Sequence, residues 1–231
     1  LKMNPLCLKD NQTNRIFLSK WFLYLVSYGK VKIPKSELAI IKNIVPKIME
    51  QKIKNLTKAA EFFNKSKTKN IHKKLSIWHG AGKYAFIFDH KEEINLNESV
   101  INAFDLTLII NQKPLLIPVL TYMLHKIEIS LDSEPSIIVI DEAWKMIDNA
   151  VIAPKIDALL KRLEQKNCIV IFSAEAVDEL ANSNITDSIN DNISTYIFMP
   201  NPNPSQYYQD VFSLDETEIN ALSYMIGDER L

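Results

Sequence analysis

The sequence has 231 residues, of which 47% are hydrophobic and 24% charged, and its formal net charge is -1. Such a chain can bury a core in one or two domains, and its charge argues against bulk binding of nucleic acid. No apolar stretch approaches the roughly 20 residues of a membrane-spanning helix. Cys7 and Cys168 lack metal-ligand spacing, so we expect reduced thiols and a cytoplasmic protein.

The first part of the chain has a helical pattern over residues 14–74. One broad apolar face recurs at helical spacing, formed by Phe17, Leu18, Trp21, Phe22 and Leu25. A second helix is expected to begin after Pro34, and Pro46 should kink or break it. A third passes through Leu56 and Phe63. Because no strand pattern interrupts this region, we expect an all-helical subdomain.

From residue 75 onward, strands are expected to alternate with helices, which is typical of a parallel sheet. The expected strands are Tyr84–Phe88, Ile137–Ile140, Ile169–Phe172, Thr195–Met199 and, from a weaker pattern, Ser99–Asp105. The expected helices are Leu115–Ile129, Val151–Gln165, and Ala176–Ser183 with Ile185–Asn190. Right-handed crossovers would place these helices on both faces of the sheet.

Two adjacent carboxylates follow the apolar run Ile137–Ile140, which predicts a buried central strand. Ligands of open α/β sheets bind at the carboxyl ends of the strands. Asp141 would therefore hold Mg²⁺ through water, and Glu142 would polarise the attacking water, as in a Walker B motif with its catalytic glutamate. The alternative is a structural core strand whose end happens to carry two exposed acids. The adjacent acids and the second apolar strand Ile169–Phe172 favour nucleotide chemistry.

A P-loop, which cradles phosphate with glycine backbone N–H groups, is missing from the sequence. The Gly-Lys pair Gly82-Lys83 does not complete a P-loop, because Ile77 stands where the first glycine is needed and Tyr84 where Ser or Thr is needed. We interpret Gly80–Gly82 as a tight turn. Either the chain begins after a P-loop, or the protein is no ordinary nucleotidase.

The basic run Lys65–Lys74 could bind nucleic acid or an anionic membrane. It lacks the interleaved aromatic residues that stack on bases, so we favour a solvated loop.

Several short motifs then carry a family resemblance. In chain order they are Asn4-Pro5-Leu6, Arg15–Leu18 with Trp21, Trp78–Gly82, Phe88-Asp89, Phe104–Thr107, Tyr122–Glu128, Ile140–Trp144 and Asn192–Pro202. This collinear series, which spans nearly the whole chain, resembles the CagE/TrbE/VirB family of conjugal-transfer proteins, the large ATPases of type IV secretion systems.

The resemblance implies an α/β fold: the C-terminal portion of a RecA-like P-loop NTPase domain, with a mostly parallel sheet and an all-helical insertion. Residues 1–13 would end a preceding RecA-like segment, residues 14–74 would be the insertion, and residues 75–231 would be the ATPase core. The P-loop of that family precedes the matched region, so we expect this chain to be a C-terminal piece that is inactive alone.

The same resemblance implies ATP and Mg²⁺ as cofactors. It also implies a homo-oligomer, expected to be a hexamer, or a mixed oligomer with a paralogue. The partners would be other type IV secretion components, and the place of action the cytoplasmic periphery of the inner membrane. Nothing in the sequence separates protein cargo from DNA cargo, although the near-neutral charge disfavours DNA.

Three positions depart from the family pattern. Glu164 stands where an arginine usually precedes the strand, and it would repel phosphate where an arginine finger would stabilise it. Glu175 replaces a glutamine that can sense phosphate, and Lys126 replaces a common arginine. The catalytic candidates are therefore Glu142, with Glu175 and Arg162 (or Lys161) as degenerate sensor and finger.

These departures leave three hypotheses open. The first is an ATPase that energises substrate transfer and pilus assembly. The second is a scaffolding subunit that keeps the motor fold and has lost catalysis. The third is a DNA-pumping ATPase of the same superfamily.

Overall fold

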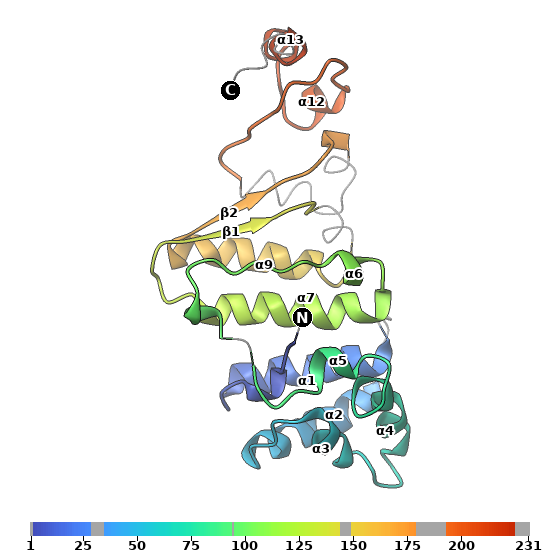
Figure 1. Ribbon diagram of the computed structural model, residues 1–231. Helices are drawn as coiled ribbons and strands as arrows, with labels where there is room; N and C mark the ends of the chain where they lie inside the picture. Colours follow the sequence, from blue (N-terminus) through green and yellow to red (C-terminus); the bar gives the residue numbers. More distant parts are fainter. Residues whose placement is uncertain (1, 29–34, 94, 144–148, 179–192, 225–231) are drawn as a thin grey trace. The chain divides into compact units, whose positions relative to one another are not determined.

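The computed structural model describes residues 2–28, 35–93, 95–143, 149–178 and 193–224 (Figure 1). The chain forms two compact units, Leu1–Ser130 and Leu131–Leu231. The segment 75–130 therefore packs with the N-terminal helices, whereas the sequence placed a division after residue 74. The expected boundary after residue 74 separates the helical insertion from the ATPase core of the family, and it remains a prediction.

The described part of the first unit is helical. Its elements are η1 (Pro5–Cys7), α1 (Gln12–Ser27), α2 (Lys35–Glu50), α3 (Leu56–Glu61), α4 (Lys69–Leu75), η2 (Ser76–Trp78), α5 (Ala85–Phe88), η3 (Leu96–Glu98), α6 (Thr107–Ile110) and α7 (Lys113–Ser130). The helices expected in the segment 14–74 and at Leu115–Ile129 are confirmed. Helix α2 continues through Pro46, so the expectation of a break there is wrong.

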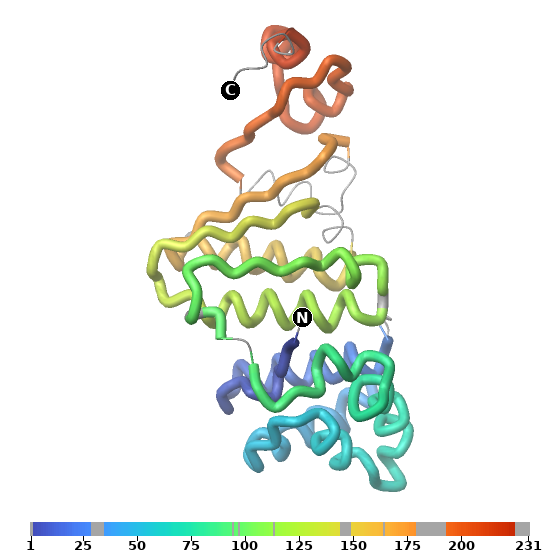
Figure 2. Tube along the Cα trace, in the orientation of Figure 1, coloured from blue at the N-terminus to red at the C-terminus, as the bar shows by residue number. Residues whose placement is uncertain are grey.

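Helix α1 is defined by its two ends and by its buried face. Asn11 caps it, because its side chain accepts a hydrogen bond from the Asn14 N–H at 2.8 Å. Tyr28 ends it in the left-handed conformation, and its hydroxyl donates to the Lys74 carbonyl at 2.8 Å. Helix α1 packs against α2, α4 and α7, which lie far apart along the chain in Figure 2.

Two tryptophans lie at the centre of this unit. Trp21 and Trp78 are completely buried, and each indole N–H donates to a backbone carbonyl: Trp21 to Pro118 at 3.1 Å, Trp78 to Leu25 at 2.9 Å. Both rings also lie against Phe88. Burying one large side chain contributes about 1.5–3 kcal/mol, so this cluster is a major source of stability.

The expected strand Tyr84–Phe88 is wrong, because Ala85–Phe88 forms the short helix α5. The turn before it sets this outcome: the Tyr84 N–H donates to the Ile77 carbonyl at 2.7 Å, and the Ala85 N–H to the Gly82 carbonyl at 3.1 Å. A short apolar run does not distinguish a strand from a buried helical turn.

The described part of the second unit contains β1 (Ser136–Ile140), α9 (Ala153–Leu163), η4 (Glu164–Lys166), β2 (Cys168–Phe172), α12 (Tyr207–Asp210) and α13 (Glu216–Tyr224). Strands β1 and β2 pair in parallel, from Ser136 opposite Cys168 to Ile140 opposite Phe172. The expected strands Ile137–Ile140 and Ile169–Phe172 and the expected helix Val151–Gln165 are confirmed. The helices expected within 176–190 lie mostly outside the described residues.

In the described residues, one face of this small sheet is covered by helix α9 and the other face is exposed. Helix α9 packs against β2 through its buried face, which includes Ile156 and Leu159. Side chains of β1 and β2 alternate between half-buried and exposed. Because β1 pairs only with β2 in the described residues, the expectation of a buried central strand is wrong here.

Two further strand expectations are also wrong. The segments Ser99–Asp105 and Thr195–Met199 form no ladder with any described residue. In the second of them, Tyr196 and Phe198 instead pack their rings against Phe212, with centroids 5.2 and 5.4 Å away. Aromatic packing takes the place of strand pairing there.

Candidate functional site

The two adjacent acids lie at the carboxyl end of β1, in a turn over residues 141–143. Asp141 is exposed and Glu142 is half-buried. Glu142 has a φ of 48°, in the left-handed region that a residue with a Cβ adopts at a cost of about 1 kcal/mol or more. Such conformations persist only where the surrounding structure enforces them. They are frequent at functional sites.

Two donors converge on a single oxygen of Asp141. The Ser173 hydroxyl donates to Asp141 Oδ1, and the Glu142 N–H donates to the same oxygen at 3.1 Å. Backbone bonds join the two strand ends as well: the Ser173 N–H donates to the Ile140 carbonyl at 3.1 Å, and the Ala143 N–H to the Ser173 carbonyl at 3.1 Å. The acid turn is therefore locked to the end of β2.

Ser173 is the site residue that the motif search missed. The register of the sheet could have found it: Ile140 lies opposite Phe172, so Asp141 and Ser173 are each the first residue beyond their strand. A serine hydroxyl placed there can orient the neighbouring carboxylate.

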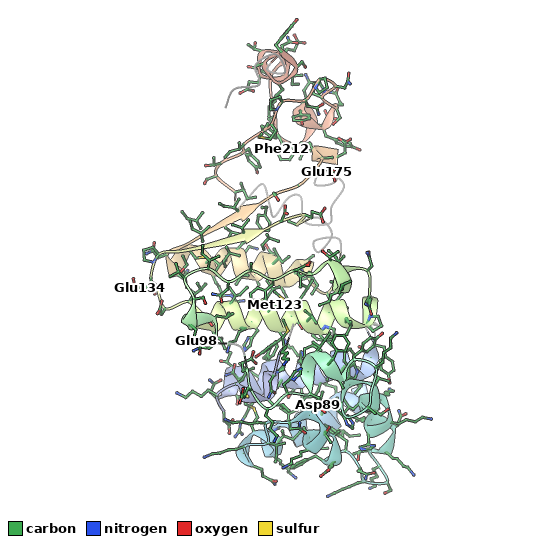
Figure 3. The ribbon with its side chains drawn as sticks, viewed as in Figure 1. Asp89, Glu98, Met123, Glu134, Glu175 and Phe212 are labelled. Carbon is green, nitrogen blue, oxygen red and sulfur yellow. The ribbon has the colours of Figure 1, made fainter. Side chains whose placement is uncertain are left out.

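Glu175 lies at this same edge of the sheet, two residues after Ser173, and it is exposed. Figure 3 places it at the opposite end of the two strands from Glu134, which precedes β1. The structure thus brings three of the expected residues, Asp141, Glu142 and Glu175, to one edge. Trp144, which follows the acid turn in the motif, lies outside the described residues.

Arg162 lies at the other edge of the sheet. It sits in the last turn of α9, which leads into the start of β2, whereas Asp141 follows the end of the parallel strand β1. Arg162 Nε donates to the Ala158 carbonyl at 3.0 Å, and its neighbour Lys161 pairs with Asp157 at 3.0 Å.

Glu164 begins η4 at this second edge, close after Arg162. Its side chain lies outside the described part of the structure.

The carboxylate oxygens of the turn over residues 141–143 meet one requirement of a Mg²⁺ site, the type of ligand atom. Mg²⁺ prefers oxygen ligands, keeps several waters, and is bound by one or two carboxylates together with substrate phosphates. Asp141 offers such an oxygen. The described residues contain no group of three or more His, Cys, Asp or Glu side chains that could hold a metal. The fit to Mg²⁺ rests on this one carboxylate, since Mg²⁺ in nucleotide sites is bound by one or two carboxylates together with phosphates and waters.

The Gly80–Gly82 turn is not a phosphate cradle. The Gly80 N–H donates to Asp89 Oδ2 at 2.8 Å, so a carboxylate already occupies the position that a phosphate would need. Burial alone would raise the pKa of Asp89, but the Thr57 hydroxyl and the N–H groups of Gly80 and Thr57 outweigh it and lower the pKa. This acid stays ionised and would repel an anion. The expected tight turn is confirmed.

Comparison with known proteins identifies the family. The family model described as the TraG P-loop domain matches residues 36–223. This chain belongs to the TraG P-loop domain family. In the described residues of this family member, no helix is long and apolar enough to cross a membrane.

Named relatives agree with this assignment. The conjugal transfer protein TrbE of Rhizobium radiobacter is 27% identical over 228 residues, covering 96% of this chain and 27% of that protein. The type IV secretion system protein virB4 of Bartonella henselae is 25% identical over 223 residues, covering 94% of this chain and 28% of that protein. The chain thus spans less than a third of the length of these two relatives.

A solved structure supports the fold. VirB4 of Thermoanaerobacter pseudethanolicus superposes with a TM-score of 0.64 at 15% identity, covering 96% of this chain and 68% of that chain. The resemblance to the CagE/TrbE/VirB family and the RecA-like fold class are therefore confirmed.

Proposed function

We propose that this chain is the Walker B portion of an ATPase that energises a type IV secretion system, acting in substrate transfer and in assembly of the apparatus or pilus. The observation that carries this proposal is the acid pair Asp141-Glu142, held at the carboxyl end of a parallel strand by hydrogen bonds from the end of the next strand. This is the edge where α/β sheets bind ligands.

The proposed roles are those of a Walker B motif with its catalytic glutamate. Asp141 would hold Mg²⁺ through water, and Glu142 would accept the proton of the water that attacks the terminal phosphate of ATP. The ion, when bound, neutralises charge on the phosphates. Because the sequence contains no P-loop and the turn at Gly80–Gly82 is closed by Asp89, the 231-residue chain alone should bind ATP weakly and hydrolyse none.

The test is ATPase activity of the protein at its full natural length, assembled as an oligomer. Glu142→Gln should lower kcat by about 10²-fold or more, because general base catalysis typically contributes 10²–10⁴-fold. Glu134→Gln is the matched control, since this exposed glutamate lies at the other end of the strands. Equal activity of the two variants would refute the assignment of Glu142.

Arg162 is proposed to act on the site of a neighbouring subunit. Its position at the edge of the sheet opposite Asp141 supports an action in trans, which makes a homo-oligomer, as a hexamer, or a mixed oligomer with a paralogue the catalytic unit. We place this assembly with other secretion components at the cytoplasmic periphery of the inner membrane. Subunits with Arg162→Ala should lose the activity that this weakened finger supports and regain part of it when mixed with Glu142→Gln subunits.

The second candidate function is a scaffolding subunit with degraded catalysis. Glu175 supports it, because this exposed carboxylate lies at the same edge as Asp141, where it adds negative charge beside phosphate. Glu164 supports it by its sequence position alone.

Two substitutions decide between motor and scaffold. Glu164→Arg should raise the ATPase rate of the full-length protein, and adding Glu175→Gln should raise it further. The upper bound is roughly 10³-fold or more, the value of a fully functional arginine finger. If neither change alters the rate of a preparation that binds ATP and forms hexamers, these two positions are wrongly assigned.

A further inference from the structure

We infer that Ser173 is a positioning residue for Asp141: its hydroxyl fixes one carboxylate oxygen and so sets how the other one meets the water shell of Mg²⁺. This inference rests on the function proposed for Asp141. Ser173 is not a ligand of the ion or the nucleotide and acts only through the acid.

The geometry concentrates two donors on one atom. Asp141 Oδ1 accepts hydrogen bonds from the Ser173 hydroxyl and from the Glu142 N–H, whereas no donor in the described residues binds Oδ2. A carboxylate with one oxygen doubly bound cannot rotate freely about its terminal bond. Oδ2 is therefore the oxygen left for a metal-bound water.

The hydroxyl is not needed to hold the strand ends together. Two backbone bonds already join them, from the Ser173 N–H to Ile140 and from the Ala143 N–H to the Ser173 carbonyl. Neither bond uses the side chain. The Ser173–Asp141 bond is also solvent-exposed, so its net contribution to the free energy of unfolding is small. Orientation of the acid is the property that would change if the hydroxyl were lost.

The expected size follows from the general behaviour of residues that orient a metal ligand. Removing such a partner typically weakens metal affinity or activity by 10–100-fold. We expect the low end, about 10-fold, because the Glu142 N–H continues to bind Oδ1 when the hydroxyl is gone.

The experiment measures binding of Mn²⁺, as a stand-in for Mg²⁺, to the full-length protein with a non-hydrolysable ATP analogue, by electron paramagnetic resonance. The Mg²⁺ concentration for half-maximal ATPase activity is measured in parallel. Ser173→Ala should weaken Mn²⁺ binding about 10-fold and raise the Mg²⁺ midpoint to match, while Ser173→Thr should stay within about 2-fold of wild type. Melting temperatures of both variants should equal that of wild type.

Ser136→Ala is the matched control. Ser136 is the first residue of β1, at the far end of the sheet, and its hydroxyl donates to the Glu134 carbonyl at 2.9 Å. It should leave Mn²⁺ binding unchanged. If Ser173→Ala does not fold, Ser173→Thr and Ser173→Val give the same comparison, because they differ chiefly by a hydroxyl.

The outcomes separate this inference from the proposed function. Weaker Mn²⁺ binding in both Asp141→Asn and Ser173→Ala supports the inference. Weaker binding in Asp141→Asn with wild-type binding in Ser173→Ala overturns it and leaves the proposed function intact. Wild-type Mn²⁺ binding and ATPase activity in Asp141→Asn overturns the proposed function itself.

Discussion

In the first unit Trp21 and Trp78 have no exposed surface, whereas in the second unit Ile137, Val139 and Ile169 expose 65%, 64% and 64% of theirs. The apolar patterns of both regions are strong in the sequence. In the first unit several helices close around the apolar side chains, while in the second α9 covers one face of β1 and β2. A strong apolar pattern thus predicts that a face becomes buried. It does not predict which segment buries that face.

The largest effect should come from the closed core of the first unit. Trp21→Ala removes a buried ring and one of the donors to the Pro118 carbonyl, so it should lower the free energy of unfolding by about 3–5 kcal/mol. Urea denaturation followed by circular dichroism measures this. A loss below about 1 kcal/mol would mean that this core is not closed in solution.

A buried asparagine of the first unit should come next. Asn4 is fully buried, and its amide donates to the Lys54 carbonyl at 2.8 Å and to the His90 carbonyl at 2.6 Å. Asn4→Ala removes both hydrogen bonds, which contribute about 0.5–1.5 kcal/mol each to the free energy of unfolding. The control is Asn11→Ala, an exposed helix cap whose loss should cost about 1 kcal/mol. Equal unfolding free energies for the two variants would contradict this ordering.

The acid Asp89 should make the first unit sensitive to low pH. Its folded-state pKa is lowered, so its contribution to stability is present above the unfolded pKa of about 3.9 and is lost as the pH falls through the folded value. The melting temperature of the wild type should therefore fall more steeply between pH 6 and pH 3 than the melting temperature of Asp89→Asn. Parallel curves for the two proteins would show that the hydrogen bonds from Thr57 and Gly80 do not favour the charged form of Asp89 over the neutral form.

The smallest effect should be found on the open face of the sheet. Val139→Ser should change the free energy of unfolding of this chain by no more than about 0.5 kcal/mol, because the side chain is already exposed. Val170→Ser, on the adjacent strand and the half-buried face, should cost more, about 1 kcal/mol or above. Indistinguishable losses would mean that the two faces are equally covered in solution.

The strands β1 and β2 could be predicted because each is a short β-branched run between turn signals, joined by a helix of suitable length. Helix α5 could not be predicted, because the turn before it is set by a bond from Tyr84 to the Ile77 carbonyl, and no periodicity encodes that bond. Thr195–Met199 has the alternating pattern of a strand, but a strand also requires a partner strand. Its aromatic rings pack against Phe212 instead.

For the candidate site, the motif alone located Asp141 and Glu142, because adjacent acids after an apolar strand are a local signal. Ser173 is distant in sequence and needed the register of the sheet. The separation of Arg162 from the acids follows from the direction of α9 and could have been predicted from the βαβ order of the elements.

The left-handed backbone of Glu142 has a consequence for how this protein would respond to selection. Glycine adopts a φ of 48° without the steric penalty that a Cβ brings, so a library screened for thermal stability should favour glycine at position 142. A library screened for the proposed ATPase activity should keep glutamate there. The two screens would disagree at this position, and the size of their disagreement would measure how much stability the protein gives up to hold one carboxylate in place.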